Sequence, residues 1–446
     1  MTLSPVLLVP HLGVVCLKRV LSVFGVGLVA ASTVAAVVAA PSATATPVSA
    51  AASVPGRYVA LTPQRALDSR TNGGAFGQGE TRSLDLSGRV PSSATAVVLN
   101  LTATAPTQPG YLTVWPTGSP QPLASSLNKK AGETRSNSVT IALPGGSNAR
   151  SVNIFNQAGS TQVVVDLLGY YDTNSGTSYY PIFDPFRAFD SRDPNQSGGG
   201  VFAPGDSVTI PLTTNISGTS ALALNITAVS PDGPGYLTGW NGETDQPTVS
   251  NVNYEPGRVT PNFAIVPVTV VSDDLVTFTI GNNVSDTDIV VDVVGGYATS
   301  GQASNSTSYV SVPPQRLSDT RDTGALGPNA VYDTSVPGGA DYYSANLNIT
   351  AVNPSDSTYL TAYASDRDKP EVSNLNVAPG DVVPNAAQPL LSIPGQYRVY
   401  NASGYVNVVA DLEGYFVGDS SGKADGKAAV RTADVVTTSS VAAVRH

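Results

Sequence analysis

Histidine and cysteine are nearly absent from this chain of 446 residues. His11 and His446 are the only histidines, and Cys16 is the only cysteine. Nucleophilic sites of the Ser-His-Asp and Cys-His kinds need a histidine base, and the usual zinc sites use histidine and cysteine ligands. The composition therefore excludes most of these chemistries, and the chain beyond its first residues has no thiol for a disulfide.

Charge is also scarce and mainly negative. Charged residues make up 13% of the chain, and the net charge is −10. Lys18 and Arg19 lie in the first 45 residues, which contain no Asp or Glu, so the remainder has a net charge of −10 − 2 = −12. A chain this acidic lacks the basic surface that binds nucleic acid and is repelled by anionic lipid. We therefore expect neither a nucleic-acid partner nor a membrane partner for the mature protein.

The first 45 residues have the pattern of a cleavable signal peptide. The basic pair Lys18-Arg19 precedes a long apolar run, 20–40, and the small residues Ala43-Thr44-Ala45 follow as a cleavage site. A second site at Val48-Ser49-Ala50 fits as well, and a retained membrane anchor is the alternative interpretation. The pattern predicts an extracellular protein, free or associated with the cell surface.

The rest of the chain contains three copies of one sequence unit. Each copy opens with the pattern R-x-x-D-[ST]-R and a glycine-rich loop. The charged residues of the three openings are Arg65, Asp68 and Arg70; Arg187, Asp190 and Arg192; and Arg316, Asp319 and Arg321. Such a repeat at fixed spacing indicates three related structural units.

Two further blocks recur in each copy. Residues 97–104, 222–229 and 345–352 alternate apolar and polar side chains with period two, which predicts a strand with one buried face. The shared asparagines of these strands, Asn100, Asn225 and Asn348, point to the other face. A block P-x-x-S-[SN]-[LV]-N-x-x-x-G-x-x-x-x-N follows, and each copy closes with an Asn ten residues before an Asp: Asn156 and Asp166, Asn282 and Asp292, Asn401 and Asp411.

These patterns predict an all-β protein with three tandem β-sandwich-like domains after the signal peptide. The expected copies are 56–172, 179–298 and 307–417, with linkers rich in small and polar residues and a disordered tail at 418–446. A small closed barrel in each copy is the alternative.

The opening R-x-x-D-[ST]-R, the central LN-[LIV]-TA and the closing V-V-x-D-x-x-G-Y-[FY] resemble a tandem β-domain of secreted proteins from high-GC actinobacteria. Ser318 in the third opening departs slightly from that pattern. The resemblance covers nearly the whole mature chain. It implies export and a non-enzymatic role, but it names no ligand.

The charged openings and the closing aspartates are the candidates for chemistry. An Asp between two Arg residues is expected to have a lowered pKa, which suits a structural ion pair better than a general acid. An anion site on the free arginine faces is the alternative. Asp68 and Asp166 could form a glycosidase pair, but arginine partners and an apolar strand around Asp166 disfavour this hypothesis. The sequence therefore predicts a protein that is not an enzyme.

The asparagines fit loop-holding roles better than a metal site. Asn128, Asn137 and Asn156 are expected to hydrogen-bond the backbone of long loops. A calcium site built from Asp and Asn oxygens stays open, but the sequence has no D-x-[DN]-x-[DN]-G loop. We predict no metal and no cofactor.

Aromatic residues in a Tyr-Leu-Thr-x-aromatic motif are the candidate ligand contacts. The residues are Tyr111 and Trp115, Tyr236 and Trp240, and Tyr359 and Tyr363. In a strand, positions four apart share a face and lie about 13 Å apart, which suits stacking on successive sugar rings. The alternative is that these rings cap the core.

Two functions fit these observations, and the sequence favours the first, with the second as the alternative. The first is a binding or adhesion module for cell-wall or extracellular polysaccharide, which gains avidity from three linked copies. The second is a structural surface-layer or stalk protein whose partner is a copy of itself. Exposed rings favour the first function, and buried rings favour the second.

Overall fold

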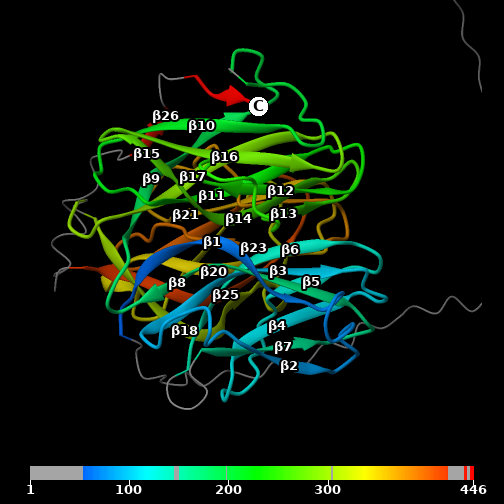
Figure 1. The fold of residues 1–446 in the computed structure, drawn as a ribbon. Coiled ribbons are helices and arrows are strands. Elements are labelled where there is room, and N and C mark those ends of the chain that lie inside the picture. The colour runs from blue at the N-terminus through cyan, green and yellow to red at the C-terminus, as the bar shows by residue number, and fades with distance from the viewer. Residues whose placement is uncertain (1–53, 145–149, 197, 303–304, 420–435, 439–441) are drawn as a thin grey trace, which may run out of the picture. The chain divides into compact units, whose positions relative to one another are not determined.

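The computed structural model describes residues 54–446 except 145–149, 197, 303–304, 420–435 and 439–441 (Figure 1). The expected signal peptide at 1–45 lies outside the described residues. The only helical elements in the described ranges are two short 3-10 turns, η2 (Thr320–Asp322) and η3 (Gly339–Asp341). None of the described helices is long and apolar enough to cross a membrane.

Each copy consists of short strands separated by glycine-, proline- and asparagine-rich turns. The strands of copy 1 are β1 (Arg57–Asp68), β2 (Thr81–Asp85), β3 (Ala94–Thr104), β4 (Gly110–Pro116), β5 (Leu127–Lys129), β6 (Arg135–Ala142), β7 (Ser151–Asn156) and β8 (Gln162–Asp172). Copy 2 has β9 (Ser178–Asp190), β10 (Ser207–Thr214), β11 (Ala221–Val229), β12 (Gly235–Trp240), β13 (Val252–Tyr254), β14 (Val259–Pro267), β15 (Thr269–Ser272), β16 (Leu275–Asn283) and β17 (Asp288–Ala298). Copy 3 has β18 (Thr307–Asp319), β19 (Val331–Ser335), β20 (Tyr342–Val352), β21 (Thr358–Ala364), β22 (Leu375–Val377), β23 (Val382–Ala387), β24 (Gln396–Asn401) and β25 (Asn407–Gly418).

The strands of each copy form two antiparallel sheets in the same order. In copy 1 the orders are β1-β8-β3-β6 and β2-β7-β4-β5. Copies 2 and 3 repeat them as β9-β17-β11-β14 with β10-β16-β12-β13, and as β18-β25-β20-β23 with β19-β24-β21-β22, and the additional short strand β15 of copy 2 pairs with β16. This strand order is that of an eight-stranded jelly roll. The predicted all-β, sandwich-like fold class is thus confirmed, and the closed barrel is not formed.

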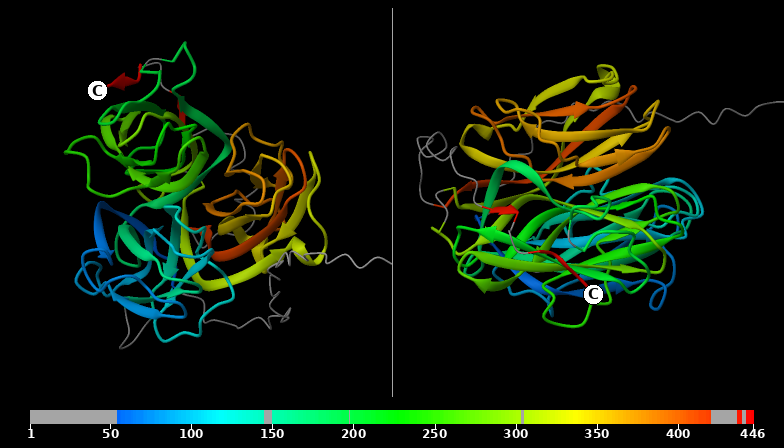
Figure 2. Two further views of the ribbon diagram at one scale, coloured as in Figure 1. Left: turned by 90° about the vertical axis from the view of Figure 1, so that its right-hand side faces the viewer. Right: turned by 90° about the horizontal axis from the view of Figure 1, so that it is seen from above.

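The first-named sheet of each copy, here called the inner sheet, faces the other copies, and the second is called the outer sheet. One apolar cluster fills the space between the two sheets of each copy, and a fourth cluster joins inner-sheet residues of all three. The inner sheets of copies 2 and 3 also join through one pair between β9 and β18. Figure 2 shows the three copies as blue-to-cyan, green and yellow-to-orange lobes.

The three copies lie within one unit, Ser49–His446. The segment between β8 and β9, which the sequence suggests is a flexible linker, is held by hydrogen bonds from the backbone of Asn174 and Ser175 to Asp172. Thr177 bridges to Tyr58 of β1. That each copy is a separate domain remains a prediction from the sequence.

The prediction of a disordered tail at 418–446 is wrong for part of that range. Strands β26 (Val436–Thr438) and β27 (Val444–Arg445) both pair with β10 in the outer sheet of copy 2. The physical reason is that β10 lies at the edge of that sheet, where an extended segment of β-branched residues can satisfy main-chain groups that no strand of copy 2 pairs with. Residues 420–435 and 439–441 lie outside the described residues.

Candidate functional site

The charged opening of copy 1 forms a closed ion-pair network. Arg65 donates through Nε to Asp166 Oδ1 at 2.5 Å and through Nη1 to Asp68 Oδ2 at 2.8 Å. Arg70 binds the same Asp68 carboxylate through Nε and Nη2. The hydrogen-bonded Arg70 guanidinium lowers the pKa of Asp68 to about 2, so this carboxylate stays ionised. The third nitrogen of Arg65 donates to the Thr248 carbonyl of copy 2 at 3.1 Å.

Copies 2 and 3 repeat the arrangement. Burial alone would raise the pKa of Asp190 and Asp319, but hydrogen bonds from Arg192 and Arg321 outweigh it and lower both values. The equivalents of the Arg65–Asp166 contact are Arg187 Nε to Asp292 Oδ1 at 2.9 Å and Arg316 Nε to Asp411 Oδ1 at 2.6 Å. The structure therefore brings each charged opening onto the closing aspartate of its own copy.

The closing aspartates are poorly placed for catalysis. The side chains of Asp166, Asp292 and Asp411 are at most 1% exposed. Burial raises their pKa, while the paired arginines oppose that rise. Each carboxylate lies in the middle of an inner sheet with an arginine on it, so a substrate cannot reach it without displacing the arginine.

One ring of each predicted aromatic pair is buried. Trp115, Trp240 and Tyr363 are only 5%, 7% and 8% exposed. They lie on the face of the outer sheet that points away from the copy's own core, beneath the loop that follows the strand. The indole of Trp115 donates to the Ser119 carbonyl, and that of Trp240 to the Thr244 carbonyl, both at 3.0 Å. These indoles are therefore buried and do not offer open stacking surfaces.

The other rings, Tyr111, Tyr236 and Tyr359, are partly exposed. In copies 1 and 3 each has an aromatic neighbour on the adjacent strand: Phe155 lies 6.4 Å from Tyr111, and Tyr400 lies 6.0 Å from Tyr359, between ring centroids. Lys369 lies over both Tyr359 and Tyr400. Sequence reasoning missed these neighbours, because cross-strand pairing between distant segments leaves no local signal.

The shared asparagines lie at the interfaces between copies, where they form a cyclic set of hydrogen bonds. In each step an Asn Nδ2 of one inner sheet donates to a serine carbonyl in the loop of the next copy. The three bonds are Asn100 to Ser250, Asn225 to Ser373 and Asn348 to Ser125. A second cyclic set joins asparagine pairs: Asn262 to Asn100, Asn385 to Asn225 and Asn137 to Asn348.

The predicted loop-holding role applies to part of this set. Asn156 donates to carbonyls of its own copy at Phe76 and Gly159. Asn137 also donates to the Ser126 carbonyl of its own loop. The residues that repeat most strictly along the sequence therefore serve both the loops and the contact between copies.

Six aromatic rings form the centre of the contact between the copies. The first strand of each copy supplies a tyrosine that lies against the last-strand ring of another copy. The pairs, with their centroid distances, are Tyr58–Tyr297 at 4.7 Å, Tyr179–Phe416 at 4.3 Å and Tyr309–Tyr171 at 4.2 Å. All six rings are buried. Glycines of the last strands, such as Gly414 against Tyr309, leave the space that these rings fill.

Two charged groups break the equivalence of the copies. Asp381 of copy 3 is buried and accepts hydrogen bonds from Lys130 of copy 1 and Arg258 of copy 2. Glu413 of copy 3 is 2% exposed, where the equivalent positions are Leu168 and Val294. Its Oε2 accepts from Thr140 N of copy 1 and from Asn346 Nδ2, both at 3.0 Å. Burial raises the pKa of Glu413 to about 8.

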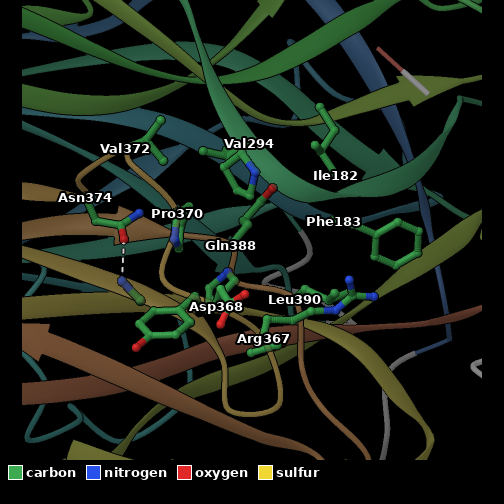
Figure 3. Close-up of a pocket in the computed structure, with 15 residues that line it drawn as sticks. Ile182, Phe183, Val294, Arg367, Asp368, Pro370, Val372, Asn374, Gln388 and Leu390 are labelled. Carbon is green, nitrogen blue, oxygen red and sulfur yellow. Dashed lines mark hydrogen bonds between the residues drawn. The ribbon is translucent and has the colours of Figure 1, made fainter. Parts of the chain in front are cut away.

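A pocket between copies 2 and 3 includes the predicted residue Tyr363. Figure 3 shows Gln388 among its lining residues, between Val294 and Leu390. Its cavity volume is only about 30 Å³, room for one or two water molecules and too little for a sugar ring. Among the described residues no cluster of three His, Cys, Asp or Glu side chains could hold a metal ion.

No family model and no curated protein matches this sequence. The solved structures that are similar to the chain include two at 9% identity and a TM-score of 0.18. One is described as "The Triple Jelly Roll Fold and Turret Assembly in an Archaeal Virus", with 82% of this chain and 91% of that chain covered. The other is described as "Life in the extremes: atomic structure of Sulfolobus Turreted Icosahedral Virus", with 81% and 91% covered. The jelly-roll assignment rests on the strand order and not on this likeness.

Proposed function

We propose that this chain is a secreted, non-catalytic structural protein of the cell surface or extracellular matrix that associates with copies of itself. One observation carries the proposal: three sandwiches close on one another through cyclic asparagine bonds and a six-ring aromatic centre. Such a closed arrangement, with most of its repeated residues used between copies, suits a rigid building block.

The non-catalytic role is part of this proposal. The openings use their arginines to hold aspartates, and the closing aspartates are buried behind those arginines. The repeated aspartates, which are the residues that might have supplied acid–base chemistry, are thereby held in ion pairs with arginines. Export and the resemblance to secreted tandem β-domain proteins are premises of the proposal, taken from the sequence.

Polysaccharide binding is the second candidate function, and one surface favours it. Tyr359, Tyr400 and Lys369 lie together on the outer sheet of copy 3, partly exposed. Aromatic faces with a nearby polar group can stack on sugar rings. The equivalent surface of copy 1 has Tyr111 and Phe155. In copy 2 the position of the second ring is Gly281, so three equal sites are not available.

Two measurements on the full chain separate these functions. Sedimentation velocity from low to high micromolar concentration is expected to show concentration-dependent assemblies. Pull-down on cell walls and insoluble polysaccharides is expected to retain little protein. A monomer at every concentration, together with strong retention that Tyr359→Ala and Tyr400→Ala abolish, would overturn the structural role in favour of glycan binding.

A further inference from the structure

Arg445 occupies a built site on copy 2. Its guanidinium lies 4.3 Å from the centroid of the Phe202 ring. Its Nη2 donates to the Asp206 carboxylate at 2.5 Å and to the Val201 carbonyl, and its Nη1 donates to the Gly199 carbonyl at 3.2 Å. One arginine side chain thus meets a ring face, a carboxylate and two carbonyls, which together match the flat, five-donor shape of a guanidinium.

Copy 1 builds the same site from its own strand. Arg82 of β2 lies 4.1 Å from the centroid of the Phe76 ring and donates to Glu80 at 2.6 Å. It also donates to the carbonyls of the loop: Gly73, Gly74 and Ala75. The two loops correspond residue by residue, Gly73 to Glu80 with Gly199 to Asp206.

The difference between the copies lies at one position. Where copy 1 has Arg82, copy 2 has Val208, an apolar side chain buried in the core of its sandwich that cannot donate a hydrogen bond to the loop. The Phe202 and Asp206 site is therefore retained without an arginine of its own strand. Copy 3 has Leu326, Ala330 and Tyr332 at these positions and lacks the carboxylate.

Main-chain pairing extends the site along β10. Ser207 and His446 exchange two backbone hydrogen bonds, with Ser207 N to His446 O at 3.1 Å and His446 N to Ser207 O at 2.8 Å. Thr209 pairs with Val444, and Ala443 packs against the apolar core of copy 2. This geometry is strand addition at a sheet edge, in which backbone bonds give affinity and a side-chain pocket gives register.

We propose that the loop 198–206 and strand β10 form a peptide-binding site for an extended segment with an anchoring arginine. By strand exchange, this site binds residues 442–446 of a second molecule of the protein. In the structure the same chain fills the site. The segment is identical in every molecule of the protein. Exchange between two molecules therefore preserves every contact and needs no new interface.

The proposal deepens the proposed self-association by naming the segment and the site that produce it. A charge-swap pair of full-length chains tests it. In Asp206→Arg the site repels its own Arg445, and in Arg445→Asp the segment repels its own Asp206. Only in a mixture do both chains find complementary partners. The unchanged segment of the first variant then fits the unchanged site of the second, and the aspartate introduced by R445D meets the arginine introduced by D206R. The double variant D206R/R445D restores the contact within one chain.

Native mass spectrometry and light scattering of isotope-distinguished variants give the readout. We expect at least a tenfold larger dimer fraction in the mixture than in either variant alone, and a double variant that assembles as the wild type does. Glu80→Arg, which breaks the corresponding site of copy 1 but keeps Asp206 and Arg445, is the matched control, and its mixture with Arg445→Asp is expected to form no more dimer than a mixture of wild type with Arg445→Asp.

The outcomes separate this proposal from the proposed function. A mixture that stays monomeric, with both variants folded by circular dichroism, overturns the exchange. Wild-type assembly that persists in both single variants also overturns it but leaves the structural function standing. A dimer in the mixture with a wild type that is always monomeric supports the site and overturns self-association of the native chain.

Discussion

Asn262 of copy 2 donates through Nδ2 to Asn100 Oδ1 of copy 1 at 3.0 Å, and both side chains are buried. Asn100 makes a second hydrogen bond to the same neighbour, because its own Nδ2 donates to the Ser250 carbonyl of copy 2. Both residues repeat in every copy, so the same positions of the sequence unit generate both cyclic sets of asparagine hydrogen bonds. A buried amide must have partners, and here the partners come from the neighbouring copy.

Asn100→Ala is therefore expected to destabilise the protein through the interface. The substitution removes the donor to the Ser250 carbonyl and one of the two acceptors of the Asn262 amide, at a cost of about 2 kcal/mol. Chemical denaturation followed by tyrosine and tryptophan fluorescence measures it. Asn195→Ala, at an exposed loop position, is the control and should change stability by less than about 0.5 kcal/mol. An equal loss in both variants would contradict the interface role.

Glu413→Gln is expected to change the pH dependence of stability. The folded pKa of Glu413 is about 8, above its ordinary value of 4.5. Between these values the folded state holds a proton that the unfolded state has lost, so unfolding free energy falls as pH rises, by about 1.4 kcal/mol per pH unit. The neutral Gln removes this slope. The variant should match the wild type near pH 4 and exceed it near pH 8.

Thermal unfolding of both proteins between pH 4 and pH 9 checks this expectation. Taking the difference between the two cancels the titration of groups that do not interact with Glu413, whereas the nearby Asp411 carboxylate is coupled to Glu413 and contributes to the measured slope. The exposed Glu371→Gln is the control. A stability difference that is constant over this range would contradict a protonated Glu413.

Trp240→Ala is expected to act on stability. The indole is 7% exposed and holds the following loop through the Thr244 carbonyl. Its removal leaves a cavity, which costs about 3 kcal/mol or more. Tyr359→Ala, at a partly exposed ring, should cost less than half as much. Denaturation curves compare the two, and a Trp240→Ala chain of native stability would show that the ring does not hold the loop.

Asp381→Asn is expected to loosen the contact among all three copies. The carboxylate is buried and pairs with Lys130 and Arg258, so the amide leaves two cations with one weak acceptor. We expect a loss of roughly 2 kcal/mol, since the partners are partly exposed and solvent screens them. Hydrogen exchange at the β14 and β23 amides should rise in the variant. Unchanged exchange there would contradict a role of the Asp381 ion pairs in holding the three copies together.

The site could be predicted from the sequence only where its parts are close along the chain. The network of Arg65, Asp68 and Arg70 follows from a six-residue motif, since local spacing puts opposite charges within reach. The sequence indicated that Asn100 points away from the apolar face, but it could not name Ser250 or Asn262 as partners. Those contacts join segments more than a hundred residues apart, and nothing local records them.

The strands and their alternation were determined by the sequence itself. The period of two in β3, β11 and β20 and the fixed spacing of the repeats predict strands with one apolar face to bury, which a sandwich or a small barrel satisfies, and the strand order of the structure decides for the sandwich. What covers the second face was decided by tertiary structure. Val98 and Ala96 point away from their own sandwich core, yet they are fully buried, because the other copies close over the inner sheet. The placement of Arg445 on copy 2 was likewise decided by tertiary structure. The edge strand β10 and the loop site at Asp206 are filled by a segment that is distant in the sequence, so no local pattern predicts the contact.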